Sequence, residues 1–360
     1  MSKMKVVLVT DSLNYGGIET YIVNLCRNIN KSKFDVSVIL LDESANGQQA
    51  VLEGLGVKVE ALTGGKMRRA FSVSRLIVAL GRPIVHFQSR HTLLLVLAKF
   101  FGAKVVLHSH FGYDFSKQQT FLKVRLQRFL LRISCKLLLA CGKVAGDGMF
   151  LGLDYEIALN GVDAGAFIFN EVSRREIRSE FNIDLNTKVI LQVGRLNYNK
   201  NQIFTTKLLE LLLDRDTNYR LICVGEGEGR SELEAVIYDH GLSDVVILAG
   251  ARSDVNKFYS AADVLVQPSL HEGLPYTLIE AQFCTLPCVA SLYIDHNVNI
   301  SGGVDFVDLT DINQWREVIM RRTNLSLNDR RSSGWIEASG YNVKVSVAVM
   351  EQWYESLYNE

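Results

Sequence analysis

Short apolar runs alternate with longer amphipathic segments along most of the chain. Strands that alternate with helices predict βαβ units, and hence parallel sheets with helices on both faces. In the first half we expect strands at Val6–Thr10, Phe34–Leu41, Val57–Leu62, Ile84–Phe87, Val105–His108, Leu137–Ala140 and Glu156–Leu159. In the second half we expect them at Val189–Val193, Arg220–Val224, Val245–Leu248, Val264–Gln267, Pro287–Ala290 and Asp305–Val307.

The segments between these strands have the length and apolar spacing of helices. In the first half the predicted helices are Gly17–Asn28, Ser72–Leu80, His91–Phe101 and Lys117–Ile133. In the second half they are Gln202–Leu213, Ser231–His240, Asp254–Ala261, Thr277–Phe283 and Ile312–Arg322.

The pattern restarts near Lys188, after an irregular passage at Asn160–Ile168 and a charged segment around Arg174–Glu180. The chain has 360 residues, more than one hydrophobic core usually supports. We therefore predict an α/β protein with two Rossmann-like, doubly wound domains, 1–165 and 166–340, facing a cleft. The segment 341–360 has one apolar helical face and is predicted to be a closing helix that packs back towards the N-terminal domain.

The net charge of zero hides an asymmetry between the two halves. Up to Gly165 there are 21 Lys and Arg against 12 Asp and Glu, and after it 18 against 27. A basic half joined to an acidic half indicates that the first half meets something anionic. An accident of surface composition is the alternative.

Cysteine usage and the first residues indicate the compartment. The six cysteines form no CxxC pair, and Cys284 and Cys288 lack the accompanying ligands of a zinc site. The chain opens directly into a strand, and its apolar runs fall short of the ~20 residues that span a bilayer. We expect a cytoplasmic protein, without a metal or a nucleic-acid partner.

The strongest candidate site is the segment from His271 to Glu280, which follows a strand and opens a helix. Gly273 permits a tight turn, and Pro275 is suited to the first helical position. The amides of Leu274, Tyr276 and Thr277 are then free to bind an anion, because they lie at a helix N-terminus. Glu280 could accept hydrogen bonds from ribose hydroxyls, while Glu272 reaches towards a sugar. A helix with one favourable and one ordinary surface glutamate is the alternative.

A second candidate follows the strand Val189–Val193. Arg195 and Lys200 lie five residues apart behind the turn residue Gly194, so both cations can be directed at one diphosphate. A solvated basic turn is the alternative. The glycine-rich run Gly225–Gly229 lacks the GxGxxG spacing, because Arg230 occupies the last glycine position, and we interpret it as a turn at the cleft edge.

In the first half, Gly16 and Gly17 connect the first strand to its helix and allow the backbone to approach a ligand closely. His86, His108 and His110 follow or end two strands, where imidazoles can bind sugar hydroxyls or share protons. A metal site is the alternative, but no carboxylate stands at ligand spacing.

The segment from Tyr113 to Lys136 interleaves basic and apolar residues. Such a helix can lie on an anionic membrane surface, and Lys66, Arg68 and Arg69 add nearby charge. An ordinary packed helix with a cationic outer face is the alternative.

Together these segments resemble the family 4 retaining glycosyltransferases of the GT-B fold, and within them the subgroup that builds bacterial capsules and exopolysaccharides. The resemblance runs over nearly the whole chain, and its densest part extends from Ser253 to Ala281. It rests on Gly16–Glu19, His108–His110, Ala140–Lys143, Asn160–Asp163, Gly194–Leu196 with Lys200–Asn201, and the pair Glu272 and Glu280, eight positions apart within Glu272–Ala281.

The resemblance implies a metal-independent transfer of a hexose-type sugar from a nucleotide-diphosphate donor, and the likeness to this subgroup implies a UDP-sugar. It implies that Arg195 and Lys200 hold the diphosphate, Glu280 the ribose, and Glu272 the transferred sugar. The amides at Leu274–Thr277 would hold the distal phosphate. Gly16 and Gly17 would close over the phosphates, and His110 would meet the sugar or acceptor.

For the acceptor side, His86, His108 and Tyr113 are the candidates, and the acceptor implied is a saccharide or lipid-linked saccharide. Peripheral attachment to the inner face of the cell membrane is the corresponding hypothesis. Asn297 stands where similar proteins often have an acidic residue, so its donor contact departs from the family pattern. A nucleotide-sugar epimerase on the same fold and a non-catalytic sugar-nucleotide binding protein are the alternative functions.

Overall fold

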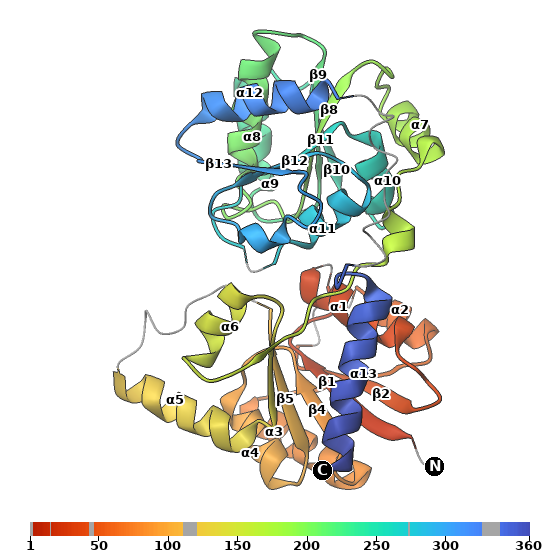
Figure 1. Cartoon of the computed structure of the whole chain (residues 1–360), viewed down its shortest axis with the longest axis vertical. Helices are drawn as coiled ribbons and strands as arrows, with labels where there is room; N and C mark the ends of the chain where they lie inside the picture. Colours follow the sequence, from red (N-terminus) through yellow and green to blue (C-terminus); the bar gives the residue numbers. More distant parts are fainter. Residues whose placement is uncertain (1–2, 15, 43–46, 111–120, 273, 326–338) are drawn as a thin grey trace. The chain divides into compact units, whose positions relative to one another are not determined.

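The computed structural model describes residues 3–14, 16–42, 47–110, 121–272, 274–325 and 339–360 (Figure 1). The chain forms two compact units, each with its own sheet and core. Unit 1 comprises Met1–Val162 and Gly340–Glu360, and unit 2 comprises Asp163–Ser339. Unit 1 is therefore built from both ends of the sequence.

Within the described residues, unit 1 holds a seven-stranded parallel sheet in the order β3-β2-β1-β4-β5-β6-β7. Its central strands are buried on both faces, which is why they are continuous apolar runs. The strands are β1 (Met4–Thr10), β2 (Phe34–Leu40), β3 (Lys58–Ala61), β4 (Ile84–Phe87), β5 (Lys104–Ser109), β6 (Leu137–Ala140) and β7 (Glu156–Ile157).

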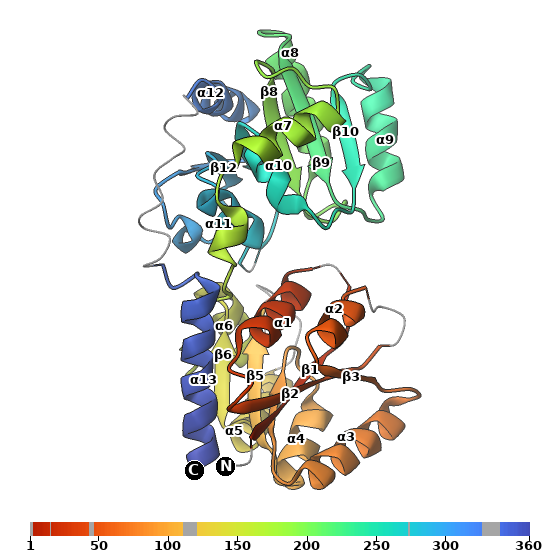
Figure 2. The same cartoon turned by 90° about the vertical axis from the view of Figure 1, so that its right-hand side faces the viewer.

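Helices cover both faces of this sheet (Figure 2). On one face α4 packs against both α3 and α5, and on the other α13 packs against α1 and β4. The helices of unit 1 are α1 (Gly17–Asn28), α2 (Gln49–Gly54), α3 (Lys66–Leu80), α4 (Thr92–Phe100), α5 (Phe121–Ser134), α6 (Lys143–Phe150) and α13 (Val343–Asn359).

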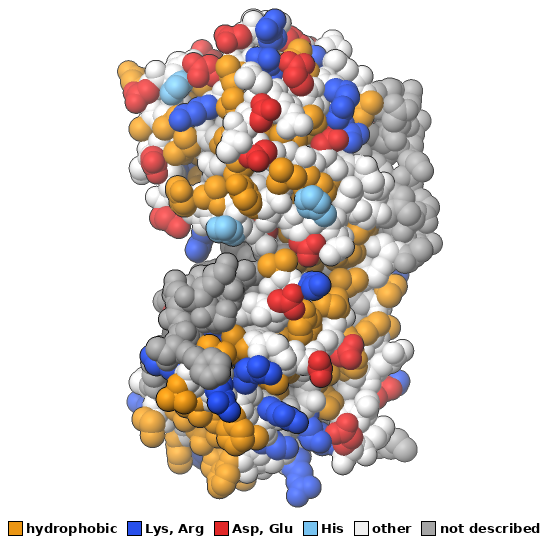
Figure 3. Space-filling view, turned by 60° about the vertical axis from the view of Figure 1, so that its left-hand side comes forward, with side chains coloured by type: hydrophobic (Ala, Val, Ile, Leu, Met, Phe, Trp, Pro, Cys, Tyr) orange, Lys and Arg blue, Asp and Glu red, His pale blue; other side chains and the backbone are white. Residues whose placement is uncertain are grey.

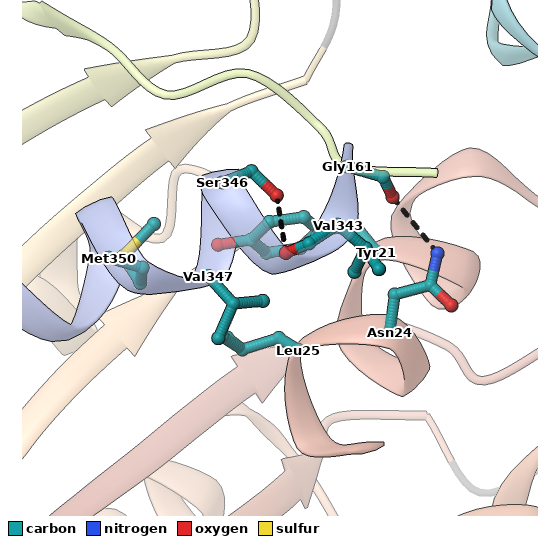
Figure 4. Close-up of a pocket in the computed structure, with 8 residues that line it drawn as sticks. All are labelled: Tyr21, Asn24, Leu25, Gly161, Val343, Ser346, Val347 and Met350. Carbon is teal, nitrogen blue, oxygen red and sulfur yellow. Dashed lines mark hydrogen bonds between the residues drawn. The ribbon is translucent and has the colours of Figure 1, made fainter. Parts of the chain in front are cut away.

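The segment that leaves unit 1 runs directly beside the segment that returns to it. Val162 accepts a hydrogen bond from the Val343 amide at 2.9 Å and donates one to the Tyr341 carbonyl at 2.8 Å. Gly161 lies so close to α13 that a Cβ there would be 2.5 Å from the Val343 Cα. Asn24 of α1 donates to the Gly161 carbonyl at 3.0 Å, beside a small pocket (Figure 4). Position 161 therefore has room for glycine only, where the two segments pass each other.

Unit 2 holds, in its described part, a six-stranded parallel sheet in the order β10-β9-β8-β11-β12-β13. Its core includes Trp315, Tyr219 and Leu208, all of them fully buried. The strands are β8 (Lys188–Val193), β9 (Tyr219–Val224), β10 (Val246–Gly250), β11 (Val264–Gln267), β12 (Cys288–Ser291) and β13 (Val304–Val307). The helices are η1 (Ala164–Phe167), α7 (Glu171–Glu180), α8 (Gln202–Leu213), α9 (Arg230–Asp239), α10 (Val255–Ala261), α11 (Tyr276–Phe283), η2 (His296–Val298) and α12 (Ile312–Thr323).

The charged segment around Arg174–Glu180, which the sequence pattern left without an element, is the helix α7, packed on α10. Two of its three arginines are buried, and both reach one carboxylate. Arg174 and Arg178 each lie 2.7 Å from an oxygen of Asp263, and Arg178 also donates to the Ala261 carbonyl at 2.9 Å. The side of α7 that faces the protein is thus formed largely by buried, hydrogen-bonded arginines. It lacks the apolar face by which an amphipathic helix is normally recognised in a sequence.

We expect Gly161→Ala to lower the free energy of unfolding by about 1–3 kcal/mol, because the added methyl group has no room beside α13. Urea unfolding of the whole chain, followed by tryptophan fluorescence and circular dichroism, measures the change. Gly54→Ala is the matched control, since nothing lies within 4 Å of a Cβ at that position. Equal midpoints for the two variants would contradict the proposed crowding.

Candidate functional site

The strand order of unit 2 reverses between β8 and β11, which are neighbours although β9 and β10 separate them in sequence. Ligands of open α/β sheets bind beyond the carboxyl ends of the strands at such a point. The turn after β8 carries Arg195 and Lys200, and the loop after β11 carries Glu272. The two strongest sequence candidates therefore meet at the switch point of the sheet.

Lys200 and Glu272 form an ion pair in this place. The Lys200 Nζ lies 2.5 Å from the Glu272 Oε1, and both side chains are largely buried, with 19% and 13% of their surface exposed. Asn199 ties the two loops together, because it donates to the His271 carbonyl at 2.7 Å and accepts from the His271 amide at 3.0 Å. The pair thus sits on a loop–loop connection rather than on two free turns.

Gln267, which no sequence argument selected, orients Glu272. Its amide nitrogen donates to the Glu272 Oε1 at 3.1 Å and to the Ser269 hydroxyl at 2.9 Å. Its amide oxygen accepts from the Thr277 hydroxyl at 3.1 Å. The signal that could have revealed it is a polar residue, fully buried, at the end of the apolar strand β11.

Arg195 is exposed, and its guanidinium has no ion-pair partner among the described residues. Its backbone is held, since Gln202 donates to the Arg195 carbonyl at 3.0 Å. A cation on a fixed turn at the edge of a parallel sheet is suited to an anionic ligand.

The glycine-rich turn after β9 presses directly on the turn after β8. A Cβ at Gly225 would be 2.1 Å from the Gly194 carbonyl oxygen, and one at Gly227 would be 2.2 Å from the Leu196 carbonyl oxygen. Leu196 also accepts from the Gly229 amide at 2.9 Å and donates to the Glu226 carbonyl at 3.1 Å. The glycines of this run therefore serve backbone packing beneath Arg195.

The helix α11 begins at Tyr276, with Pro275 as its N-cap, at the carboxyl end of β11. Leu274 and Thr277 lie at this helix start, as the sequence pattern predicts, whereas Gly273 lies outside the described residues. Asn297 lies in the short helix η2, where its amide donates to Asp295 at 3.0 Å.

Glu280 lies on α11 and accepts a hydrogen bond from the Tyr259 hydroxyl at 2.5 Å. Burial raises the pKa of its carboxyl group to about 7, against the lowering effect of that hydrogen bond. Burial also raises the pKa of Tyr259 well above its ordinary value. At neutral pH the Glu280 carboxyl group can therefore gain or lose its proton readily.

In unit 1 the strand order reverses between β1 and β4; Gly16 is the N-cap at the end of the turn after β1, and Gly17 opens α1. At the same edge His91 lies 2.6 Å from Asp11, and this hydrogen bond is the main cause that lowers the pKa of the Asp11 carboxyl group. Gln88, after β4, contacts the His110 ring at 2.7 Å. Asp11, Gln88 and His91 were not selected from the sequence, because single residues in loops carry no pattern.

The three predicted histidines form a row. The rings of His86 and His108 stack at 5.5 Å, and those of His108 and His110 lie 4.0 Å apart. His86 and His108 are fully buried, and His86 contacts the Tyr354 hydroxyl at 2.6 Å. Burial lowers the pKa of His86 and of His110 to about 3, so both rings are neutral at physiological pH.

Their burial gives His86 and His108 a packing role, in contact with Tyr21 of α1 and Tyr354 of α13. Their contact with an acceptor stays a prediction. Tyr113, the other acceptor-side candidate, lies outside the described residues. His110 is the member of the row that is half-buried, at the end next to Gln88.

In the part of the chain that the structure describes, no three His, Cys, Asp or Glu side chains are grouped as metal ligands. No described helix is long and apolar enough to cross a membrane. All six cysteines lie in the described part of the chain, none of them forms a disulfide, and five are buried.

Two family models match the chain. Glycosyltransferase Family 4 matches residues 15–163, and Glycosyl transferases group 1 matches residues 173–297. The two ranges together take in well over half of the chain and carry the site residues of both sheets. The chain belongs to the family 4 glycosyltransferases, which are enzymes of the retaining GT-B class.

Two relatives match this chain over most of their length. The EpsF protein of Bacillus subtilis, whose name assigns it to the glycosyltransferases, is 28% identical over 343 residues, covering 89% of this chain and 88% of that protein. The UDP-Gal:alpha-D-GlcNAc-diphosphoundecaprenol alpha-1,3-galactosyltransferase of Escherichia coli is 24% identical over 307 residues, covering 80% of this chain and 79% of that enzyme.

Among solved structures, HepE of Anabaena in complex with UDP and glucose is similar, with a TM-score of 0.82 at 17% sequence identity. The match covers 98% of this chain and 100% of that one. At this identity the likeness concerns the fold, and it confirms the predicted GT-B architecture of two Rossmann-like parallel sheets with a C-terminal helix.

We expect Gly225→Ala to lower the free energy of unfolding by about 3 kcal/mol, because the methyl group meets a backbone oxygen and φ is +142°. Gly241→Ala is the control: φ is also positive there, at +64°, but nothing lies within 4 Å. Its cost should be about 1 kcal/mol, from backbone strain alone. Urea midpoints measure both, and equal losses would show that crowding between the turns contributes nothing.

The raised pKa of Glu280 has a consequence for stability. Between its ordinary pKa of 4.5 and about 7, the folded protein holds a proton that the unfolded chain releases, so stability falls as the pH rises through this window. In Glu280→Gln this decline should disappear. The difference in unfolding free energy between the wild type and the variant should therefore change by up to about 3 kcal/mol from about pH 4 to about pH 8.

Urea unfolding across that pH range measures the difference. Glu232→Gln, an exposed glutamate of α9, is the control and should keep the wild-type pH profile. A Glu280→Gln profile parallel to the wild type would contradict the raised pKa.

Proposed function

We propose that the protein transfers a hexose-type sugar from a UDP-sugar to a saccharide or lipid-linked saccharide, with retention of configuration and without a metal ion, in the synthesis of a cell-surface polysaccharide such as a capsule or exopolysaccharide. The observation that carries the proposal is the pair of cations, Arg195 and Lys200, at the switch point of the unit 2 sheet. The choice of UDP as the nucleotide is supported by the ligands of the Anabaena protein, UDP and glucose, and the lipid-linked acceptor by the name of the Escherichia coli enzyme.

Arg195 and Lys200 hold the donor diphosphate in this proposal. Arg195 is exposed and unpaired among the described residues, so it binds an anion without breaking another contact. Lys200 already faces Glu272 at 2.5 Å, and a diphosphate would share it with that carboxylate. Two positive charges stabilise the negative charge that develops on the departing diphosphate, which is the role a metal ion has in other transferases.

Glu272 and Glu280 hold the rest of the donor. Gln267 and Lys200 fix Glu272 from two directions, so its carboxylate is oriented before the sugar arrives. Glu280, held by Tyr259, accepts hydrogen bonds from the ribose hydroxyls in its charged form. The helix start at Leu274–Thr277 contributes backbone amides for the distal phosphate.

The reaction exchanges one bond at the anomeric carbon for another on the same face of the sugar. The bond to the diphosphate oxygen breaks, the bond to the acceptor hydroxyl oxygen forms, and the acceptor proton leaves with the nucleotide diphosphate. In unit 1, Gly16 and Gly17 approach the phosphates, and His110 meets the sugar or the acceptor. A lipid-linked acceptor places the enzyme at the inner face of the cell membrane, attached peripherally.

Calorimetric titration of UDP in excess EDTA tests the donor site, with GDP and ADP as comparisons. We expect UDP to bind despite the chelator, and Arg195→Ala to weaken its binding about tenfold to a hundredfold, since a charge-assisted contact is lost. Glu280→Ala should weaken UDP binding as well. Arg215→Ala, an exposed cation elsewhere in unit 2, is the control and should bind as the wild type does.

Binding that requires a divalent metal, or no nucleotide binding at all, would overturn the proposed donor site. Once a donor is found, incubation with the UDP-sugar alone tests one of the two alternatives, the epimerase. A nucleotide-sugar epimerase would convert the sugar without releasing UDP, whereas the transferase releases UDP only when an acceptor is present.

A further inference from the structure

One long stretch of unit 1 contains almost no negative charge. Residues 61–146 hold 15 Lys and Arg and a single acidic residue, Asp114. The helices α3, α4 and α5, which lie in this stretch, contain nine Lys and Arg and no Asp or Glu. These three helices therefore carry nine of the 21 Lys and Arg of the first half, without a carboxylate among them.

The same three helices expose large apolar side chains. Their inner faces are already occupied, because Val73, Leu95 and Leu131 are buried in the core of unit 1. The outward apolar side chains are thus additional to those the fold requires. They include Met67, Phe71, Phe100, Leu122 and Phe129, whose exposed fractions are 78%, 70%, 79%, 77% and 58%.

These side chains belong to one continuous layer, because α4 packs against both α3 and α5. Figure 3 shows orange and blue side chains gathered together over the lower part of unit 1. Each helix contributes both kinds: exposed cations stand on α3, α4 and α5 at Arg68, Lys99 and Arg132. We name the outward surface of these three helices the α3–α5 face.

We propose that the α3–α5 face binds the surface of an anionic lipid bilayer. Apolar side chains interleaved with cations suit the boundary between acyl chains and negatively charged headgroups, where both kinds of contact are satisfied together. Aromatic rings and aliphatic side chains enter the boundary, and the long Lys and Arg side chains reach the phosphates.

The charge argues against a second copy of this chain as the occupant. In a two-fold dimer the same face meets itself, which would bring the exposed cations of both copies together, Arg68, Lys99 and Arg132 among them, while the three helices contain no carboxylate to compensate. The proposal deepens the proposed function, from which it takes the lipid-linked acceptor, but it depends on no residue of the donor site.

Co-sedimentation of the whole chain with vesicles tests the α3–α5 face. We expect binding to vesicles of phosphatidylcholine with phosphatidylglycerol, little binding to phosphatidylcholine alone, and weaker binding at high salt. Replacing one cation on each helix, Arg68→Gln with Lys99→Gln and Arg132→Gln, should weaken binding about a hundredfold, at roughly fivefold for each charge. Phe71→Ala with Phe100→Ala and Phe129→Ala should remove the binding that persists at high salt.

The controls carry equivalent changes away from this face. Lys207→Gln with Arg215→Gln and Lys344→Gln removes three exposed cations, and Val172→Ala with Leu185→Ala and Tyr238→Ala removes three exposed apolar side chains. Both controls should bind vesicles as the wild type does.

Equal binding to neutral and anionic vesicles, or losses as large in the controls, would overturn the proposal. The proposal would also be overturned if the triple phenylalanine variant bound vesicles as the wild type does but sedimented differently in their absence. The α3–α5 face would then join copies of the chain. UDP titration of the same variants separates this result from the proposed function: the variants should keep nucleotide binding, whatever the vesicles show.

Discussion

The site of unit 2 depends on the close contact between two turns that are far apart in sequence. Gly225 and Gly227 leave no room for a side chain, so the turn after β9 supports the backbone of Gly194 and Leu196 directly. Because backbone contacts backbone, the turn that carries Arg195 is supported from below, while the Asn199–His271 hydrogen bonds hold the loops that place Lys200 2.5 Å from Glu272. A functional side chain on a loop has a well-defined position only when the backbone of the loop is fixed by contacts with the rest of the protein.

Much of this architecture could be predicted from the alternation of apolar runs and amphipathic segments. The strands Ile84–Phe87, Leu137–Ala140 and Val264–Gln267 and the helices Gly17–Asn28 and Gln202–Leu213 have the predicted bounds. Parallel strands buried on both faces are short, uniformly apolar and separated by turns, which makes them easy to recognise. The candidate residues of the donor side could be found because they follow such strands directly.

What could not be predicted depends on partners remote in sequence. The helix α7 has no apolar face to recognise, since its buried Arg174 and Arg178 are both paired with Asp263, over eighty residues away. Gln267, which orients Glu272, differs from the last residues of other strands only in its partners, Glu272 and Thr277. The histidine row was recognised, but its enclosure by Tyr21 and Tyr354 comes from helices at opposite ends of the chain. A local pattern contains no information on which distant side chain covers a residue.

Unit 1 closes only when its last helix is in place, and this has a consequence for how the protein is made. A chain leaves the ribosome from its first residue onwards, so the sheet of unit 1 is synthesised long before α13, which packs on α1 and β4. Unit 2 is continuous in sequence and can fold during that interval. Until then His86 and Phe34 lack their contacts with Tyr354, and the nascent chain exposes a surface that chaperones recognise.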